Sequence, residues 1–214
     1  MTLFRDSFHI LLLAAGKSLR MGRENKLLMP YGRKPMIRHI AQQLLKADMG
    51  EVTVVTGFEA EGLSKKLRGL KLNLCFNPDF EAGQMSSVKT GISHLPQSQL
   101  QSPSGVMVVL ADMPSLTWRD YRHLADAFFR HSPDKITIPY YDGKRGNPII
   151  IPGYLLPEIR NGTLHAGCKN LIRNHPDKVH KLPVSSSAFI RDIDTPADYD
   201  QVTRHHFFSH APCC

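Results

Sequence analysis

The hydrophobic positions of this chain follow two patterns, one typical of strands and one typical of helices, which alternate along the sequence. Residues 8–13 and 106–111 are almost continuously apolar, which is typical of strands buried on both faces of a parallel sheet. Shorter apolar segments are bounded by turn residues such as Asp142-Gly143. Together these patterns predict strands at residues 8–13, 51–56, 71–76, 106–111, 135–139, 147–151, 179–183 and 189–193.

Between the strands, hydrophobic residues are spaced three or four apart, as on one face of a helix. In residues 35–49 this spacing is followed by Gly50, a helix stop signal. The sequence Thr195-Pro196-Ala197-Asp198 combines a cap, a proline and an acidic first turn, so it indicates the start of a last helix. Helices are predicted at residues 35–49, 60–67, 84–95, 116–129 and 168–174 and from Thr195 onward.

This alternation indicates right-handed βαβ units. The expected fold class is α/β, with a mostly parallel, Rossmann-like sheet between two helical layers (αβα). Ligands of such sheets bind at the carboxyl ends of the strands. The residues that follow the strands are therefore the first candidates for a functional site.

Length and composition indicate a single folded domain. Of the 214 residues, 42% are hydrophobic and 21% are charged, so we assign residues 1–204 to one domain and residues 205–214 to a flexible tail. No apolar run approaches the roughly 18 residues of a membrane span, and no signal-peptide cleavage pattern is present, so we expect a cytoplasmic protein without membrane contact. The net charge of +8 is spread along the chain without a basic block, which favours a small anionic substrate over nucleic acid.

The loop after the first strand has the composition of a phosphate-binding loop. Leu13-Ala14-Ala15-Gly16 offers small residues that let backbone N–H groups approach a ligand, and Arg20 and Lys26 add positive charge. These features suit a triphosphate, because arginine binds oxygens in pairs and lysine acts as a point charge. The alternative is an ordinary glycine-containing surface loop with solvated basic side chains.

Two aspartates follow apolar strands and are candidate metal ligands. Asp112 comes directly after one strand, and Asp194 ends the strand predicted at 189–193. Carboxylates from two strand ends can share one Mg²⁺ ion, which prefers oxygen ligands. The alternatives are a turn residue at Asp112 and a helix cap at Asp194, although Thr195 is better placed to cap. Strand alternation assigns Asp192 to the opposite face, in a structural or supporting role.

The chain resembles the MobA-like nucleotidyltransferases, and among them the molybdenum-cofactor cytidylyltransferases. The resemblance rests on five segments between residues 8 and 200: Leu13–Gly16 with Ser18, Arg20-Met21-Gly22 and Lys26; Asn77-Pro78 with Gly83, Ser86 and Ser87; Ala111-Asp112-Met113-Pro114; Arg145-Gly146-Asn147-Pro148; and Asp192–Asp198. It implies a sheet of the nucleotide-diphospho-sugar transferase type. One feature departs from the family pattern, since three residues instead of two separate Gly22 from Lys26. Arg23 is the alternative phosphate ligand if this insertion displaces Lys26.

The resemblance also implies roles for individual residues. Nucleotide contacts are expected from Leu13, Ala14, Ala15, Gly16, Arg20, Lys26, Asn77, Gly83 and Ser87, and acceptor contacts from Arg145, Gly146, Asn147 and Lys169. Arg20, Lys26 and Asp112 are the expected catalytic residues, and Asp112 and Asp194 the expected ligands of Mg²⁺ or Mn²⁺. Structural alternatives stay open, namely an Asx turn at Asn77, a helix first-turn serine at Ser87 and a solvated hairpin residue at Arg145.

The function implied by the resemblance is transfer of CMP from CTP to molybdopterin, with release of pyrophosphate. Ala15, in a Leu-Ala-Ala-Gly rather than a Leu-Ala-Gly-Gly segment, favours cytidylyl transfer, since its methyl group would narrow the base pocket. A molybdenum hydroxylase apoenzyme or its chaperone is the macromolecular partner that this function implies. The alternatives are guanylyl or other nucleotidyl transfer to a different phosphorylated acceptor, and a non-catalytic cofactor carrier.

Overall fold

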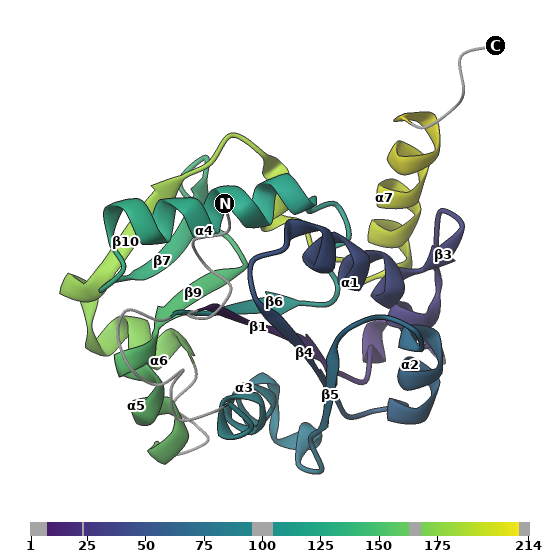
Figure 1. Ribbon diagram of the computed structural model, residues 1–214. Helices are drawn as coiled ribbons and strands as arrows, with labels where there is room; N and C mark the ends of the chain where they lie inside the picture. Colours follow the sequence, from purple (N-terminus) through teal and green to yellow (C-terminus); the bar gives the residue numbers. More distant parts are fainter. Residues whose placement is uncertain (1–7, 23, 96–104, 163–167, 210–214) are drawn as a thin grey trace.

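The fold is a mixed, mostly parallel sheet with helices on both faces (Figure 1). The computed structural model describes residues 8–22, 24–95, 105–162 and 168–209. The eight-stranded sheet has the order β10-β7-β9-β6-β1-β4-β5, and β8 pairs with β7. Strand β9 runs antiparallel to its neighbours β6 and β7. The strands of this sheet are β1 (Phe8–Ala14), β4 (Glu51–Thr56), β5 (Asn73–Phe76), β6 (Gly105–Leu110), β7 (Ile136–Tyr141), β8 (Lys144–Arg145), β9 (Ile149–Pro152) and β10 (Val179–Pro183).

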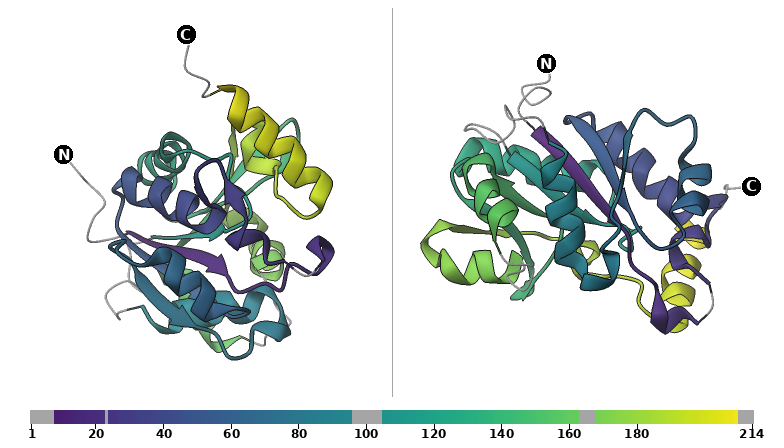
Figure 2. Two further views of the ribbon diagram at one scale, coloured as in Figure 1. Left: turned by 90° about the vertical axis from the view of Figure 1, so that its right-hand side faces the viewer. Right: turned by 90° about the horizontal axis from the view of Figure 1, so that it is seen from below.

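Two hydrophobic clusters, one on each face of the sheet, hold the layers together. The first joins β1 to α1, α2 and α4, and the second joins β1 to α3, α5 and α6. Figure 2 shows these two helical layers on either side of the sheet. The three-layer αβα expectation is therefore confirmed. The helices are α1 (Met36–Ala47), α2 (Ala60–Leu67), α3 (Gln84–Ser93), α4 (Trp118–His131), α5 (Leu156–Asn161), α6 (Cys168–Asn174) and α7 (Pro196–Ser209).

Strand β1 is central because all seven of its residues are buried. Its side chains alternate between the two clusters, so its apolar run supplies both faces at once. His9 is the polar exception, and its Nε2 lies 2.9 Å from Thr53 Oγ1 on β4. Burial lowers the pKa of His9 to about 4, so the imidazole is neutral at pH 7.

Capping residues act as the sequence indicates. Thr117 and Asp120 form a capping box at the start of α4, and Thr195 and Asp198 exchange the equivalent hydrogen bonds at the start of α7. Helix α1 ends earlier than predicted, because Asp48 takes a left-handed conformation two residues before Gly50.

Several predicted elements differ from the structure. Residues 189–193 are not a strand: Ser186 caps a 3₁₀ helix, η7 (Ser187–Ile190), and residues 191–194 follow without regular structure. Helix α5 and the small hairpin of β2 (Pro30–Tyr31) and β3 (Lys34–Pro35) were not predicted, because both are too short for a periodic signal. Helix α7 runs to Ser209, so residues 205–209 of the expected tail continue a helix that meets no glycine or proline. Residues 210–214 lie outside the described residues.

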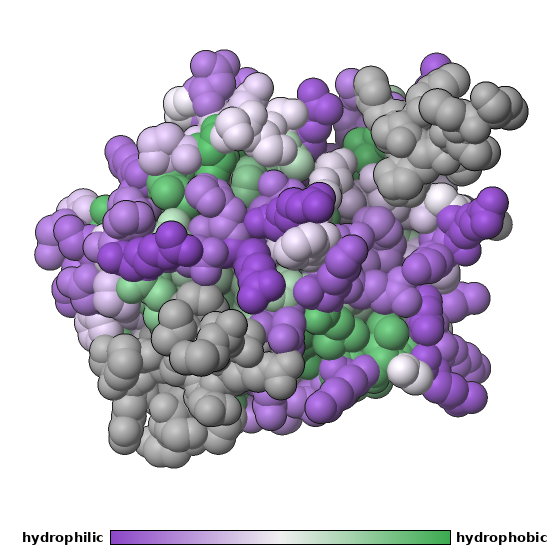
Figure 3. Space-filling model, turned by 45° about the horizontal axis from the view of Figure 1, so that its top comes forward, coloured by the Kyte–Doolittle hydropathy of each residue, from purple (hydrophilic) through white to green (hydrophobic). Residues whose placement is uncertain are grey.

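Most of the described surface seen in Figure 3 is hydrophilic, with hydrophobic residues in small areas. Among the described residues, none of the helices has the length and apolar character that crossing a membrane requires.

Candidate functional site

A cavity of about 570 Å³ opens at the carboxyl ends of β1 and β6. Its walls come from the loop after β1, the segment that leads into α3, the end of β6 and the segment before α7. The sequence predictions Leu13, Ala14, Ala15, Gly16, Arg20, Lys26, Gly83, Ser87, Asp112 and Asp194 all line this cavity. Residues from four separate segments of the chain thus meet where a doubly wound sheet binds its ligands.

The loop after β1 is built from two short turns. Ser18 takes a left-handed conformation and precedes η1 (Leu19–Met21). Asn25 then begins η2 (Lys26–Leu28), and its side chain accepts a hydrogen bond from the Leu27 N–H. This second turn sends the Lys26 side chain back into the cavity. The extra residue before Lys26 therefore does not keep the lysine side chain out of the cavity. Arg23 lies outside the described residues.

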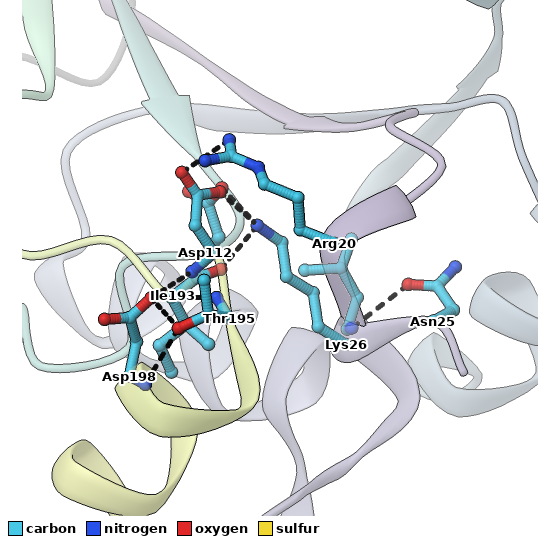
Figure 4. Close-up of polar contacts among 9 residues, drawn as sticks. Arg20, Asn25, Lys26, Asp112, Ile193, Thr195 and Asp198 are labelled. Carbon is cyan, nitrogen blue, oxygen red and sulfur yellow. Dashed lines mark hydrogen bonds and ion pairs between the residues drawn. The ribbon is translucent and has the colours of Figure 1, made fainter. Parts of the chain in front are cut away.

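Lys26 joins the loop to the two aspartates of the metal prediction. Its ammonium donates to Asp112 Oδ2 at 2.8 Å, to the Ile193 carbonyl at 2.5 Å and to Asp194 Oδ1 at 3.2 Å. Figure 4 shows the lysine reaching from its turn to this group of oxygens. Arg20 pairs with the other oxygen of Asp194 at 2.7 Å. The two loop cations and the two carboxylates therefore form one network.

A third carboxylate belongs to the same cluster. One carboxylate oxygen from each of Asp112, Asp192 and Asp194 lies within 4.8 Å of the other two. The backbone brings them together, because the Ile193 N–H donates to the Asp112 carbonyl at 2.9 Å. The assignment of Asp192 to the opposite face was wrong, because residues two apart in a strand, such as Asp192 and Asp194, share a face, and residues 191–194 are in any case irregular. Asp192 lines the cavity, and no sequence signal distinguished it from Asp194 once a strand had been assumed.

The three carboxylates suit a divalent cation. One oxygen of Asp112, Oδ1, is buried without a hydrogen-bond partner among the described residues. Desolvation, and then the charges of Asp112 and Asp194, raise the pKa of Asp192. Unsatisfied and mutually repelling carboxylate oxygens are the ligands that a hard divalent ion prefers.

Asn77 supports the wall of the cavity that contains Ser87. Its amide nitrogen donates to Ser86 Oγ and Ser87 Oγ, and its oxygen accepts from the Asp79 N–H and the Thr90 hydroxyl. The side chain is fully buried and does not line the cavity. Asn77 thus lies behind the cavity, hydrogen-bonded to Ser87, and the alternative Asx turn is present.

Glycines shape this wall in two ways. Gly83 has φ +99°, which places it in a turn that glycine favours, and no side chain crowds it. Gly57 instead permits close packing, since a Cβ there would lie 2.6 Å from Phe80 and 2.8 Å from Ala15. Phe80 thus packs beside Ala15 at the cavity. Neither Phe80 nor the adjacent ion pair of Lys17 with Glu81 was predicted for the site.

Three of the predicted acceptor residues, Arg145, Gly146 and Asn147, do not line the cavity. Arg145 is exposed on β8, opposite Tyr140. Gly146 is a packing residue, because a Cβ there would lie 2.5 Å from the Phe189 carbonyl, and the Asn147 N–H donates to the same carbonyl. Lys169 is in α6, and its side chain lies outside the part of the chain that the structure describes. Among the acceptor residues whose side chains the structure describes, Arg145, Gly146 and Asn147, none lines the cavity.

A mostly parallel sheet between two helical layers, with a cavity at the carboxyl ends of its strands, is the arrangement in which doubly wound α/β proteins bind their ligands. Residues 10–179 match the MobA-like NTP transferase domain, so the chain belongs to the MobA-like NTP transferase family.

Relatives of similar length carry different names. Nicotine blue oxidoreductase of Paenarthrobacter nicotinovorans is 26% identical over 86% of this chain and 90% of its own length. The purine catabolism protein PucB of Bacillus subtilis is 27% identical over 90% and 94%. Among solved structures, Rv0371c of Mycobacterium tuberculosis has a TM-score of 0.80 at 20% identity, with 94% of this chain and all of that chain covered. A manganese complex of Rv0371c has a TM-score of 0.73 at 18% identity, with 92% and 98% covered. At these identities the solved structures show a shared fold.

Proposed function

We propose that this protein is a Mg²⁺-dependent cytidylyltransferase that transfers CMP from CTP to molybdopterin and releases pyrophosphate. The observation that carries the proposal is the meeting of Arg20 and Lys26 with Asp112, Asp192 and Asp194 at one cavity. Nucleotidyl transfer needs cations for the triphosphate and carboxylates for a metal, and it needs them within a few ångströms of each other.

Each residue has a distinct task in this reaction. The acceptor phosphate oxygen forms a bond to the α-phosphorus of CTP, and the bond between the α-phosphorus and its bridging oxygen to the β-phosphate breaks. The backbone of Ala14–Gly16 approaches the nucleotide, and Arg20 and Lys26 neutralise phosphate oxygens. Asp112, Asp192 and Asp194 would hold Mg²⁺, which supplies Lewis-acid stabilisation of the charge on the transferring group.

The preference for CTP rests on the wall around Ala15. Its methyl group and the packed Phe80 ring reduce the space beside the Leu-Ala-Ala-Gly segment, which favours a pyrimidine over a purine. Molybdopterin as the acceptor is carried by the family resemblance of the sequence motifs. The manganese complex of Rv0371c supports a divalent ion in a protein of this fold.

The first test is thermal unfolding of the purified protein with each of CTP, GTP, ATP and UTP, with and without Mg²⁺. A ligand that binds only the folded state raises its stability, by about 2.7 kcal/mol at a hundredfold excess over Kd. We expect a Mg²⁺-dependent rise with CTP. Pyrophosphate release is then measured with CTP and molybdopterin together and with each alone.

Each outcome has a distinct meaning. Pyrophosphate release that requires both substrates supports the proposal. A rise in stability with GTP alone transfers the proposal to guanylyl transfer. Nucleotide binding without pyrophosphate release in the presence of molybdopterin contradicts this acceptor. An absence of any nucleotide effect supports the carrier alternative and contradicts the enzyme.

A further inference from the structure

The ammonium of Lys26 is satisfied entirely by groups of the protein. It has three N–H groups, and three oxygens accept from it: Asp112 Oδ2, Asp194 Oδ1 and the Ile193 carbonyl. Its side chain is only 11% exposed. Lys26 therefore holds the oxygens that a metal would use, instead of extending toward a phosphate.

Arg20 extends the same arrangement. It binds the second oxygen of Asp194, so both oxygens of that carboxylate face a cation of the loop after β1. The side chain of Arg20 is 70% exposed, whereas those of Asp112 and Asp194 are 21% and 30% exposed. Water screens the charge of Arg20 more than that of Lys26, so Lys26 interacts more strongly with the carboxylates.

We infer that Lys26 competes with a divalent metal ion for Asp112 and Asp194, so that a nucleotide and the metal bind cooperatively. The nucleotide half of this inference rests on the proposed function. A triphosphate offers Lys26 and Arg20 new oxygen acceptors, and their transfer frees the carboxylates for the metal. Without nucleotide, the lysine charge weakens metal binding both by repulsion and by holding the ligands.

The decisive experiment measures Mn²⁺ binding to the whole protein without nucleotide, by calorimetric titration and by the electron spin resonance signal of free Mn²⁺. We expect Lys26→Met to bind Mn²⁺ about tenfold more tightly than the unmodified protein, which is within the usual range of coupling between two ligands. Arg20→Gln is expected to tighten binding by about threefold, because its charge is screened. Lys34→Met, which removes an exposed lysine that donates to Gln42, is the control and should leave the Kd unchanged.

Lys26→Met also removes the donor to the Ile193 carbonyl, so folding is checked by circular dichroism. If that variant does not fold, Lys26→Gln replaces it, because its amide can still donate to this carbonyl. Lys26→Arg, which keeps the charge, should bind Mn²⁺ as weakly as the unmodified protein. Equal Mn²⁺ affinity in the unmodified protein and in the folded neutral variants would overturn the competition.

A second titration tests the nucleotide half. CTP is added in the presence of EDTA, and Lys26→Met or Lys26→Gln is expected to bind it about tenfold more weakly. Unchanged CTP affinity would overturn the transfer of Lys26 to the phosphates. The Mn²⁺ titration contains no nucleotide, so it separates the two proposals. If the unmodified protein turns over CTP but the variants bind Mn²⁺ with unaltered affinity, only the competition is refuted. If the variants bind Mn²⁺ more tightly but the unmodified protein does not turn over nucleotide, only the proposed function is refuted.

Discussion

The two halves of the sheet contribute very differently to the cavity. In the parallel half, the ends of β1 and β6 with the loops that follow them, together with the segment that leads into α3, supply nearly all of its described walls. Asp192 and Asp194 are the lining residues that come from the far end of the chain. The half that contains β7, β8, β9 and β10 supplies none of the described lining residues, although four acceptor residues were predicted there or in α6.

This difference shows which chemistry can be inferred from a strand pattern. Buried parallel strands end at one edge of a sheet, so residues that follow them converge whatever their identity. The β7–β8 hairpin runs antiparallel, and the segment after it is tied to η7 because the Asn147 N–H donates to the Phe189 carbonyl. Its position relative to the cavity therefore depends on a packing contact that no periodicity reveals.

The largest expected effect tests the parallel half. Asp112→Asn should reduce CMP transfer on the order of 10²-fold or more, because it removes a metal-binding charge and an acceptor of Lys26. Turnover at saturating CTP and Mg²⁺ is the measurement. Asp142→Asn is the matched control, since asparagine also tolerates the left-handed conformation of that exposed turn. Full activity in a folded Asp112→Asn protein would remove Asp112 from the proposed metal site.

His9 tests whether a polar residue of the parallel half can be purely structural. The pKa of His9 is about 4 in the folded protein and 6.5 when unperturbed, so the unfolded chain takes up the proton first. Its stabilising contribution is complete above pH 6.5 and is lost as the pH falls toward 4. The shift corresponds to about 3 kcal/mol in the free energy of unfolding.

Urea unfolding across this pH range measures that contribution. His9→Gln cannot titrate but can still bond to Thr53, and we expect it to lose about 3 kcal/mol less stability between pH 6.5 and pH 4 than the unmodified protein. CMP transfer at pH 7 should be unchanged. If the free energy of unfolding changes equally with pH in the two proteins, protonation of the His9 imidazole does not destabilise the fold.

Asn77 tests a support of the cavity wall. Asn77→Ala removes a hydrogen-bond partner from Ser86, from Ser87 and from the Asp79 N–H, so we expect a loss of about 1–3 kcal/mol in stability. Because Ser87 loses its orienting bond, the KM for CTP should rise while kcat changes little. Asn73→Ala, an exposed asparagine on β5, is the control. A fall in kcat without a change in KM would contradict a purely positioning role.

The same comparison explains what could be predicted from the sequence. The order of layers and the cavity at the strand ends follow from the apolar runs, whereas the ion pair of Lys26 with Asp112 was not predicted. The assignment of Asp192 to the face opposite Asp194 was wrong, because residues two apart in a strand share a face, and Ser186 in any case caps a 3₁₀ turn where a strand was predicted. The role of Asn77 was missed because its four hydrogen bonds depend on how α3 packs under the cavity. Side-chain partners across elements are tertiary facts, and residue type alone does not specify them.

The smallest effect is expected at Arg145, in the half that does not line the cavity. Solvent screens an exposed charge, so the charge contributes little to binding. Arg145→Ala should therefore raise the KM for the acceptor by no more than about tenfold and leave the KM for CTP unchanged. Lys144→Ala, the neighbouring exposed residue of β8, separates a specific contact from a general loss of positive charge. Equal effects of the two substitutions would indicate only a diffuse attraction for an anion. A rise of a hundredfold or more at Arg145 alone would mean that the acceptor bridges both halves of the sheet, and the cavity described here would then be only the nucleotide side of a larger site.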